Sequence, residues 1–446
     1  GTVDVGAASD GVFITGNDNE VGSLNPAGRN LISGNGDQGI DCGGGDRNRI
    51  LGNFIGTDVT GTQALPNGTE GIAFTLLAEQ NEVIGNLISG NANDGVSMIG
   101  SATNSASTPR QTLIRGNIIG ANVTGTAALP NGASGIFIQN SPLNTIGGTG
   151  LGEGNLIAFN TQDGVEMIDN AQAGSGVFTI GNAVRASAIH SNGQLGIDLG
   201  NDGVTPNDPG DIDASPNRFQ NFPVLTSAAA NTKLISGALN TESNRTYRIE
   251  FFANAGCDPL GHGEGTSFLG ATSVTTTGSG NASVHFVSPA ALAAGAFITA
   301  TATDADGNTS EFSPCRSVSS GSNDSDGDGM SDEFEQHFFG HPTNGDPTAD
   351  PDGDGLTNVG EFITGLHPLD SQSRLQLTIE RTAQSVVLRT PSVPGRLYTV
   401  EVATTLPNFT EPPLVQDVPG TGGMLEFTDA IGAAQKHYRV IVELAP

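Results

Sequence analysis

One segment of this chain occurs twice. Residues 52–68, GNFIGTDVTGTQALPNG, return as residues 116–132, GNIIGANVTGTAALPNG, at an offset of 64 positions. A shorter motif, Asn-Leu-Ile-Ser-Gly-Asn, lies at residues 30–35, recurs at 86–91 and returns in a looser form at 155–160. Repeats of this kind are typical of stacked architectures, because each unit buries its apolar face only against its neighbours.

Short strand-like segments follow glycines through the first half of the chain. Gly-Val or Gly-Ile pairs recur at spacings of 24 to 40 residues, beginning at Gly11, Gly39, Gly71, Gly95, Gly135, Gly164 and Gly196. Further triplets, such as residues 49–51, 82–84 and 112–114, lie between them. Strands this short, with Gly and Asn at the corners, predict the coils of a parallel β-helix over residues 1–222. Equivalent Asn side chains are expected to hydrogen-bond from one coil to the next.

The repeats resemble those of secreted bacterial right-handed parallel β-helix proteins. The resemblance rests on the Gly-Asn-hydrophobic-Ile-Gly motif and on the insertion Ile-Gly-Thr-Asp-Val-Thr-Gly-Thr at residues 55–62. It covers about half of the chain. Because the broader relatives of that fold include pectate lyases and polygalacturonases, the resemblance implies that an enzyme must be considered.

An enzyme of this shape would need converging charged side chains. Lyases use a calcium-binding acidic cluster beside a basic residue, and hydrolases use two or three carboxylates on one strand face. Candidate fragments are Asp41, Asp46 and Arg47 in one coil, and Asp198 with Asp202 near the end of the repeats. Neither fragment matches a polygalacturonase pattern. The sequence therefore favours solvated turn residues and assigns no catalytic residue.

The chain is strongly acidic. Its 446 residues include 47 Asp and Glu against 17 Lys and Arg, which gives a formal net charge of −30. Such a surface repels phosphate backbones and anionic lipid head groups, so nucleic-acid binding is disfavoured, whereas divalent cations suit it. The same charge could also serve solubility alone. No apolar stretch approaches the roughly 20 residues that a membrane span needs, and the start at Gly1 indicates a processed or excised mature form.

After the repeats a different pattern begins. Tyr247, Ile249 and Phe251 alternate with charged residues, as in a half-buried strand, and residues 297–303 form a further strand. The length and strand density predict an immunoglobulin-like sandwich over residues 223–319. The segment resembles sandwich modules that follow β-helices in secreted bacterial proteins. A spacer is favoured over a carbohydrate-binding module, since the chain contains no Trp.

The three cysteines are Cys42, Cys257 and Cys315. Cys257 lies in the first half of the predicted sandwich and Cys315 lies close to its end. In an oxidising compartment a disulfide between these two would tie an early loop to the final strand. Cys42 would then remain as a small buried apolar residue. A reduced pair is the alternative.

Residues 320–372 contain the most specific chemistry. Two twelve-residue segments, 26 positions apart, fill every ligand position of a calcium-binding loop. Ca²⁺ takes carboxylates at positions 1, 3 and 5, a backbone carbonyl at 7, a ligand at 9 and both oxygens of a Glu at 12. The predicted ligands are Asp324, Asp326, Asp328, Met330, Asp332 and Glu335 in the first loop, and Asp350, Asp352, Asp354, Leu356, Asn358 and Glu361 in the second.

The role of these loops follows from what surrounds them. A Ser/Gly linker precedes the first loop, so only helices that leave the loops are expected, over Ser331–Phe339 and Val359–Gly365. The segment resembles the compact calcium linkers of thrombospondin type 3 and dockerin modules, although the recognition motif of dockerins is missing. In millimolar extracellular calcium such sites would be constitutively filled, which favours a structural ion over a switch or docking to a cohesin.

Alternating strands separated by Pro and Gly predict a small antiparallel sandwich over residues 373–446. The strands are expected near residues 375–379, 385–388, 395–402 and 438–442. The run Gly-Arg-Leu-Tyr-Thr-Val-Glu and the closing Tyr-Arg-Val resemble a terminal module of many secreted or surface bacterial proteins. That resemblance implies anchoring, secretion or assembly, and it carries no catalytic motif.

Together these features predict a mainly β protein, secreted or displayed at the cell surface. A parallel β-helix is followed by a β-sandwich, a short EF-hand-like calcium segment and a C-terminal antiparallel sandwich. The expected function is structural or adhesive, with calcium as cofactor and with extracellular polysaccharide, or a second copy of the chain in a fibre, as partner. The alternative is a polysaccharide lyase or glycoside hydrolase that acts in the β-helix groove.

Overall fold

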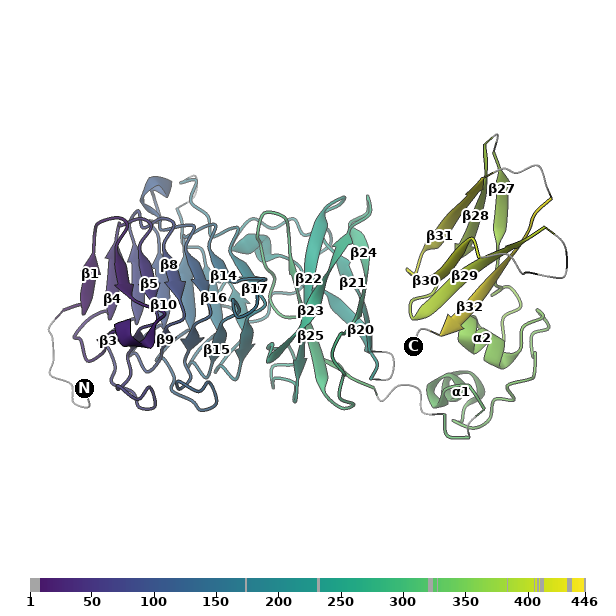
Figure 1. Cartoon of the computed structure of the whole chain (residues 1–446), viewed down its shortest axis with the longest axis horizontal. Coiled ribbons are helices and arrows are strands. Elements are labelled where there is room, and N and C mark those ends of the chain that lie inside the picture. The colour runs from purple at the N-terminus through teal and green to yellow at the C-terminus, as the bar shows by residue number, and fades with distance from the viewer. Residues whose placement is uncertain are drawn as a thin grey trace. The chain divides into compact units, whose positions relative to one another are not determined.

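The structure is a computed structural model that describes residues 9–172, 175–230, 233–319, 324–326, 328–382, 384–404, 406, 409, 413–430 and 435–444. It is mainly β, with parallel sheets in the N-terminal half and small antiparallel sheets after them (Figure 1). Backbone contacts divide the chain into two compact units. Unit 1 comprises residues 1–226, 237–284 and 296–317, and unit 2 comprises residues 227–236, 285–295 and 318–446.

Three parallel sheets form the N-terminal part of unit 1 (Figure 1). The first face contains β1 (Val12–Ile14), β4 (Ile40–Gly43), β7 (Ile72–Thr75), β10 (Val96–Ile99), β13 (Ile136–Gln139), β16 (Val165–Ile168) and β19 (Ile197–Leu199). The second face contains β2 (Glu20–Gly22), β5 (Arg49–Leu51), β8 (Glu82–Ile84), β11 (Leu113–Arg115), β14 (Thr145–Gly147) and β17 (Ala183–Arg185). The third face contains β3 (Leu31–Ile32), β6 (Phe54–Ile55), β9 (Leu87–Ile88), β12 (Ile118–Ile119), β15 (Leu156–Ala158) and β18 (Ala188–His190). Every third strand returns to the same face, as in the predicted parallel β-helix.

Apolar side chains that point into the coils form the core of the β-helix. On the first face Ile40 is in register with Ile72, Ile72 with Val96, and Val96 with Ile136. All four side chains are fully buried. Because neighbouring strands lie about 4.8 Å apart, these residues stack into a continuous column.

The glycine before each strand of the first face is explained by a close approach of two coils. A Cβ atom at Gly71 would lie 2.6 Å from the Gly95 carbonyl oxygen and 2.7 Å from Ile88 Cγ2. A Cβ atom at Gly95 would meet the Gly135 carbonyl oxygen at the same distance, 2.6 Å. Only glycine fits where the backbone approaches so closely, which accounts for the recurring Gly-Val and Gly-Ile pairs.

Columns of Asn side chains hydrogen-bond from coil to coil, which confirms the prediction for the corners. In one column Asn86 Nδ2 donates to Asn117 Oδ1 at 3.0 Å. In another, Asn67 Nδ2 donates to Asn91 Oδ1 at 2.8 Å, and Asn91 Nδ2 donates to Asn131 Oδ1 at 2.9 Å. These residues are buried, so each amide depends on its neighbours for partners that water cannot supply.

The repeated insertion forms the same small loop twice. An antiparallel bridge closes residues 57–64 in the first copy and residues 121–128 in the second. The two loops contact each other, since the Val123 N–H donates to the Gly61 carbonyl oxygen at 2.9 Å. The repeat in the sequence is therefore also a repeat in space.

An antiparallel sheet of the predicted sandwich covers the last coil within unit 1. Its strand order is β23–β22–β25–β26, with β22 (Thr246–Asn254), β23 (Ser267–Thr275), β25 (Phe297–Thr303) and β26 (Arg316–Ser317). Phe252 and Phe312 are each 2% exposed and belong to the same apolar cluster as Ile197 and Leu199 of the coils. This sheet and the β-helix share one core, and the predicted boundary at residue 222 lies inside unit 1.

In a longer β-helix, backbone N–H groups of the last coil would donate to carbonyl groups of a further coil. Here they donate to acidic side chains of the segments that cover this coil. Glu250 accepts the Ala186 N–H at 2.7 Å, and Glu311 accepts the Leu199 N–H at 3.0 Å. Glu264 binds two further N–H groups of the last coil in the same way. Because an unpaired buried donor costs about 1–3 kcal/mol, these glutamates terminate the stack.

The remaining elements are small. A three-stranded sheet contains β20 (Val224–Ala228), β21 (Leu234–Asn240) and β24 (Asn281–Val287). Unit 2 holds the helices α1 (Asp332–Phe339) and α2 (Asn358–Thr364), and two antiparallel sheets. Those sheets contain β27 (Thr378–Arg381), β28 (Ser385–Pro391) and β31 (Met424–Ala430), and β30 (Val415–Pro419), β29 (Arg396–Ala403) and β32 (His437–Leu444). Short 3₁₀ segments lie at Pro26–Gly28, Ser105–Ser107 and Asn217–Phe219. In the part of the chain that the structure describes, no helix has the length and apolar character to cross a membrane.

The cysteines lie in different environments. Cys257 and Cys315 form a disulfide, with their Cα atoms 5.9 Å apart and a separation of 58 positions in sequence. Cys42 is a free thiol that is fully buried in the β-helix core. Burial raises its pKa to about 12, so it stays a neutral thiol.

Replacement of one ladder amide should destabilise the β-helix. In the variant Asn91→Ala, an Asn67 amide hydrogen loses its acceptor inside the coil. We expect a loss of about 1–3 kcal/mol, measured as a lower urea midpoint by far-ultraviolet circular dichroism. The exposed Asn93→Ala serves as the matched control and should change stability by less than about 0.5 kcal/mol. Equal effects of the two substitutions would contradict the role of the ladder.

Candidate metal centres

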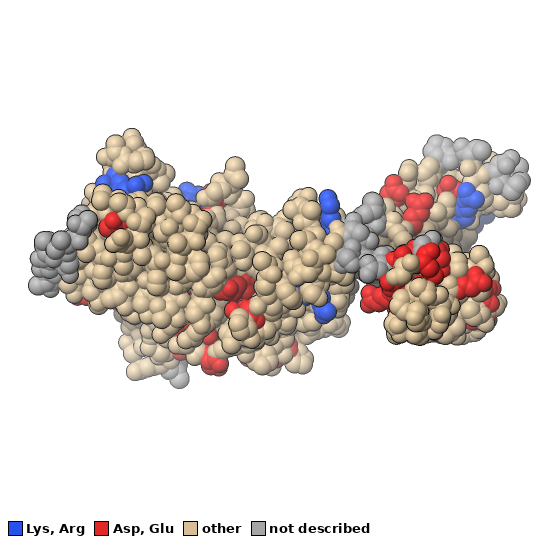
Figure 2. Space-filling model, turned by 90° about the horizontal axis from the view of Figure 1, so that it is seen from below, with Lys and Arg blue, Asp and Glu red and all other residues tan. Residues whose placement is uncertain are grey.

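Two short helices carry the acidic loops of unit 2. The hydroxyl groups of Ser331 and Thr357 cap the N-termini of α1 and α2. Both helices end at a glycine with a left-handed backbone, Gly340 or Gly365. The bounds agree to within one residue with the predicted helices that leave the loops. Figure 2 shows Asp and Glu side chains gathered over this part of unit 2.

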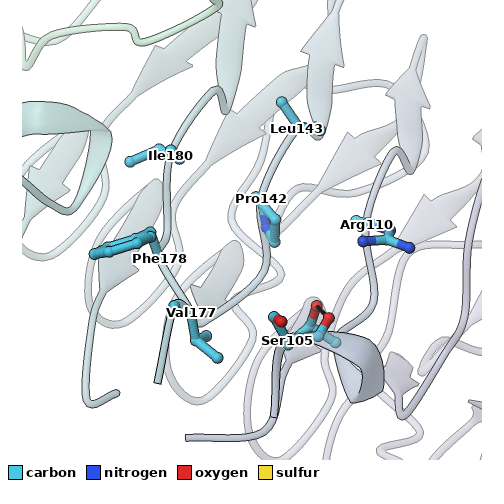
Figure 3. Close-up of a pocket in the computed structure, with 9 residues that line it drawn as sticks. Ser105, Arg110, Pro142, Leu143, Val177, Phe178 and Ile180 are labelled. Atoms are coloured by element: carbon cyan, nitrogen blue, oxygen red, sulfur yellow. Dashed lines mark hydrogen bonds between the residues drawn. The ribbon is translucent and has the colours of Figure 1, made fainter. Parts of the chain in front are cut away.

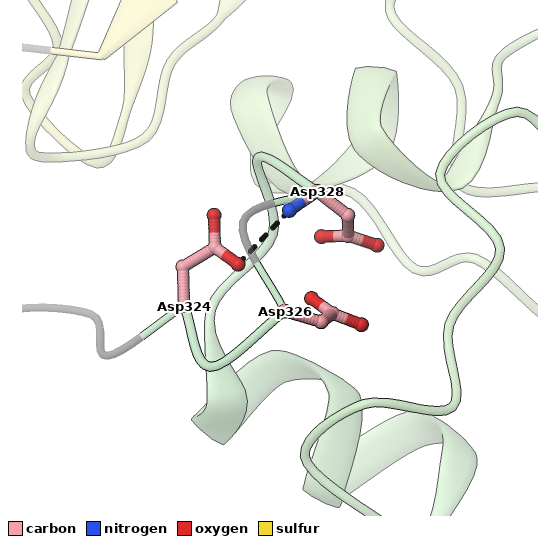
Figure 4. Close-up of side chains that lie close together, drawn as sticks. All are labelled: Asp324, Asp326 and Asp328. Atoms are coloured by element: carbon pink, nitrogen blue, oxygen red, sulfur yellow. Dashed lines mark hydrogen bonds between the residues drawn. The ribbon is translucent and has the colours of Figure 1, made fainter.

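In the first loop three carboxylates converge. One oxygen from each of Asp324, Asp326 and Asp328 lies within 4.8 Å of the other two (Figure 4). Asp324 also folds the loop, because its Oδ1 accepts the Asp328 N–H at 3.0 Å and its Oδ2 accepts the Gly329 N–H at 2.9 Å. Gly329 has a φ of 94°, a conformation that favours glycine.

The residues at the later positions of the first loop differ in their contacts. Glu335 is fully buried; its Oε1 accepts the Gly345 N–H at 2.8 Å, while its Oε2 has no donor among the described residues. The carboxylate of Asp332 accepts the N–H and the hydroxyl of Ser325, at 2.8 and 2.7 Å. Met330 is buried. Glu335 therefore keeps an oxygen for a ligand, whereas Asp332 is engaged within the loop.

The second loop repeats the arrangement. One oxygen from each of Asp350, Asp352 and Asp354 lies within 4.8 Å of the other two. The Leu356 N–H donates to Asp354 Oδ1 at 2.8 Å, which closes the turn. Glu361 is fully buried, and neither of its carboxylate oxygens accepts a hydrogen bond from a described residue.

Both loops bury side-chain oxygens that accept no hydrogen bond from a described residue. The oxygens of Glu335 and Glu361 also lie near other carboxylates of the same charge. Asn358 is 2% exposed; its amide nitrogen donates to the Asp346 carbonyl, but its Oδ1 has no donor in the described part of the chain. Burial and the nearby Asp352 raise the pKa of Glu361 to about 7, and burial raises that of Glu335. A cation would bind these oxygens and offset their charge. Each cluster could therefore hold a metal ion.

The two loops are joined through their helices. The rings of Phe334 in α1 and Phe362 in α2 pack with their centroids 5.3 Å apart. Arg396 at the start of β29 donates to the Phe362 carbonyl oxygen at 2.8 Å. The aromatic contact makes the position of one loop depend on that of the other.

Two of the three candidates in the second coil of the β-helix, Asp46 and Arg47, bind a neighbouring coil. Arg47 forms an ion pair with Asp18 of the neighbouring coil, at 2.8 Å. Asp46 accepts the Glu79 N–H at 3.1 Å. Burial, followed by nearby carboxylates, raises the pKa of Asp41 to about 6. Arg47 and Asp46 thus join neighbouring coils.

Asp198 belongs to a row of carboxyl groups on the first face that the sequence interpretation missed. Glu166 of β16 is in register with Asp198 of β19, and Asp163 lies just before β16. The three residues are 0–3% exposed, whereas Asp202 is exposed. Asp163 Oδ1 accepts the Leu195 N–H at 2.8 Å, and its Oδ2 has no donor among the described residues. A sequence signal did exist, since the acid precedes one of the recurring Gly-Val pairs.

Burial raises the pKa of each carboxyl group of this row and that of Glu311. Burial and the neighbouring Asp198 raise the pKa of Asp163 to about 7. Burial raises the pKa of Glu311 to about 8, although backbone N–H groups oppose the shift. Carboxyl groups in such an environment can act as acids or bases near neutral pH.

A shallow pocket on the side of the β-helix is mostly apolar (Figure 3). Its lining includes Pro142, Leu143, Val177 and Phe178, with Arg110 at one side. The Arg110 guanidinium is bound to Glu79 at 2.5 Å. The lining residues therefore do not form an acid–base pair.

Comparisons with known proteins do not identify a family. No family model matches the chain, and no curated protein matches it. Among solved structures, the Pseudomonas aeruginosa CupB2 chaperone has 10% identity and a TM-score of 0.13, covering 48% of this chain and 96% of its own. A structure of the exo-β-D-glucosaminidase CsxA has 8% identity and a TM-score of 0.16, covering 49% of this chain and 25% of its own. TM-scores this low carry no structural argument.

The buried acids should make unit 1 less stable as the pH rises. Asp163 is protonated in the folded state up to about pH 7 but ionises near pH 3.9 when unfolded. The contribution of Asp163 to the free energy of unfolding is therefore fully present below pH 4, and it is lost as the pH rises through 7.

This loss can be isolated with Asp163→Asn, which mimics the protonated acid. Relative to the variant, the wild type should lose about 1.4 kcal/mol of unfolding free energy per pH unit between pH 5 and 7. Urea unfolding at several pH values measures the difference, and the exposed Asp202→Asn serves as the control. A difference that is constant with pH would contradict the assignment.

Proposed function

We propose that this chain is a secreted or cell-surface structural protein whose acidic loops bind two calcium ions. One observation carries the proposal. Glu361 is fully buried beside three Asp carboxylates, and its two oxygens have no donor within the described residues. A buried carboxylate in that setting is costly unless a cation binds it.

Calcium suits these loops better than smaller or softer ions. Each loop offers carboxylates, a backbone carbonyl and a bidentate Glu, which matches the six to eight oxygens that Ca²⁺ takes. Mg²⁺ requires compact octahedral geometry and retains much of its water. The side chains that converge at the first positions of each loop are all Asp, so thiophilic metals are disfavoured.

The ions would act as structural ligands. Both loops are short and their helices pack together through Phe334 and Phe362, so bound calcium would hold the two helices in one arrangement. Outside the cell the ion is abundant enough to keep such sites filled. The disulfide between Cys257 and Cys315 supports an oxidising compartment.

The partner of a structural β-helix would be a second copy of the chain or an extracellular polysaccharide. The sheet that contains β22 covers the C-terminal coil, so an end-to-end contact would use the other end. There β1 is the edge strand of the first face among the described residues, and Phe13 is 61% exposed. Electron microscopy with and without calcium tests this contact, and monomers at high concentration would argue against a fibre.

Replacement of one bidentate ligand should weaken one calcium site enough to remove it from the titration. In Glu361→Gln we expect the second site to weaken by at least about tenfold, since two of six to eight ligand oxygens are altered. Isothermal titration of the metal-free full chain should give two sites in the wild type and one in the variant. Glu333→Gln, an exposed residue of α1, is the matched control and should retain two.

Calcium should also raise the melting temperature of the full chain. At a free concentration a hundred times the dissociation constant, each ion stabilises the folded state by about 2.7 kcal/mol. Scanning calorimetry with calcium and with a chelator measures the shift. Identical melting curves, or equal stabilisation by Mg²⁺, would contradict structural calcium.

A second candidate function is hydrolysis of a polysaccharide on the first face of the β-helix. The observation in its favour is the row of Asp163, Glu166 and Asp198, because carboxyl pairs with raised pKa values serve glycoside hydrolysis. Their burial weighs against direct contact with a polymer. If new reducing ends appear with a panel of neutral and acidic glycans, and disappear in Asp198→Asn, the hydrolase replaces the structural role.

A further inference from the structure

A buried polar cluster lies in unit 1, away from the row of carboxyl groups. Asp211 and Gln220 belong to the segment between β19 and β20, Thr241 follows β21, and Tyr247 lies in β22. The four side chains are 0–4% exposed. The cluster therefore joins the chain that leaves the β-helix to the strands that follow it.

The contacts place a hydroxyl between a carboxylate and a carboxamide. Thr241 Oγ1 donates to Asp211 Oδ2, and Gln220 Nε2 lies 3.0 Å from the same hydroxyl oxygen. Gln220 Nε2 also donates to Asp211 Oδ2 at 2.6 Å. The Tyr247 hydroxyl lies 3.1 Å from Thr241 Oγ1.

Backbone contacts hold these groups in place. The Thr241 N–H donates to the Gly280 carbonyl oxygen at 2.9 Å. The N–H of Asn221, next to Gln220, donates to Asp211 Oδ1 at 3.2 Å, and its side-chain amide donates to the Asn240 carbonyl at 2.9 Å. The carboxylate and the two chain segments are thus fixed against one another.

We infer that Thr241 and Gln220 become joined by an intramolecular ester, formed by the protein itself with release of ammonia. The Thr241 hydroxyl lies beside a buried base and beside the carboxamide of Gln220, and a hydroxyl next to a base can be activated as a nucleophile. Fixed proximity of this kind replaces a bimolecular encounter and raises the effective concentration by orders of magnitude. Burial of all four residues excludes the water that would otherwise compete.

The proposed step balances without any oxidant or cofactor. Asp211 Oδ2 takes the hydroxyl proton of Thr241 as Oγ1 forms a bond to Cδ of Gln220. The Cδ–Nε2 bond then breaks, and Asp211 returns the proton to the leaving nitrogen. The products are the ester, one ammonia molecule and the regenerated carboxylate.

The surroundings suit these roles. Burial raises the pKa of Asp211 to about 6, although the Thr241 hydrogen bond opposes the shift. A carboxyl with that pKa can both accept and return a proton near neutral pH. The Gln220 carboxamide presents its nitrogen to Oγ1, so attack at Cδ requires a rotation about the Cγ–Cδ bond that turns the face of the carboxamide toward the hydroxyl.

An ester here would close a covalent ring between residues that are 21 positions apart. Like a disulfide, it would restrict the unfolded chain and stabilise the folded one. It lies in unit 1, whereas the acidic loops lie in unit 2. The inference is therefore independent of the proposed calcium binding.

The mass of the purified full chain tests the proposal. After folding, prolonged incubation at neutral pH, reduction and denaturation, the wild type should be lighter than its sequence by one ammonia. In a tryptic digest, peptides 219–233 and 234–245 should remain linked, and hydroxylamine should separate them. Loss of ammonia from an Asn-Gly step would lower the mass by the same amount but would not link two peptides. The digest therefore distinguishes this source of the mass decrease from the ester.

Variants assign the roles. Thr241→Val removes the nucleophile and Asp211→Asn removes the base, and both should have the full mass with separate peptides. Thr241→Ser keeps the hydroxyl and should restore the link. Thr276→Val removes another buried hydroxyl, which binds the Glu242 carbonyl, and should leave the link intact.

The wild type alone decides the case if a variant fails to fold. Full mass and separate peptides in folded, incubated wild-type protein would overturn the ester and leave only a hydrogen-bonded cluster. A link that persists in Thr241→Val would also overturn it, because the nucleophile would then be another residue.

Discussion

Hydrogen bonds between the backbones of successive coils are the constraint on which unit 1 depends. The Ile40 N–H donates to the Gly71 carbonyl and the Ile72 N–H to the Gly95 carbonyl, both at 3.0 Å. The same register stacks the apolar side chains inside the coil and aligns the Asn amides at its corners. A slip of one residue would turn every inward side chain outward. The close approach of the coils also explains why the position before each strand of the first face is glycine.

A stack of this kind must end, and the way it ends shapes the chemistry of unit 1. The final coil has N–H groups that no further coil receives, and Glu250, Glu264 and Glu311 accept hydrogen bonds from them. Glu250 and Glu311 are buried, and burial raises the pKa of Glu311. The buried row at Asp163 and Asp198 adds to this concentration of acids. The concentration of acidic side chains at the end of the β-helix is thus explained in part by the hydrogen bonds that they accept from backbone N–H groups.

Unit 2 depends on a different balance. Its acidic loops bring carboxylates within 4.8 Å of one another, which is unfavourable for the protein alone. Buried Glu335 and Glu361 add charge where water cannot solvate it. The packing of Phe334 against Phe362 fixes the loops in spite of this repulsion. A bound cation would be coordinated by these carboxylates and would offset their mutual repulsion.

The sequence by itself determined the features that depend on local spacing. The Gly-Val and Gly-Ile pairs predicted the coils, the recurring Asn predicted the ladders, and two twelve-residue patterns predicted the acidic loops. Each of these features repeats within a few dozen residues, so its period is visible in the chain. The helix bounds followed because caps and left-handed glycines act on their immediate neighbours.

Only the tertiary structure decided which distant residues meet. Asn308 reaches Gly181 across 127 positions, and Glu311 reaches Leu199 across 112. The meeting of Asp211 with Thr241 likewise depends on how the segment that leaves the β-helix packs against the strands that follow it. No periodic pattern marks these residues, because each contact is made once, where the repeating stack gives way to a non-repeating sheet. The sequence specified the repeating parts through their period, and the fold alone specified the contacts at which that period ends.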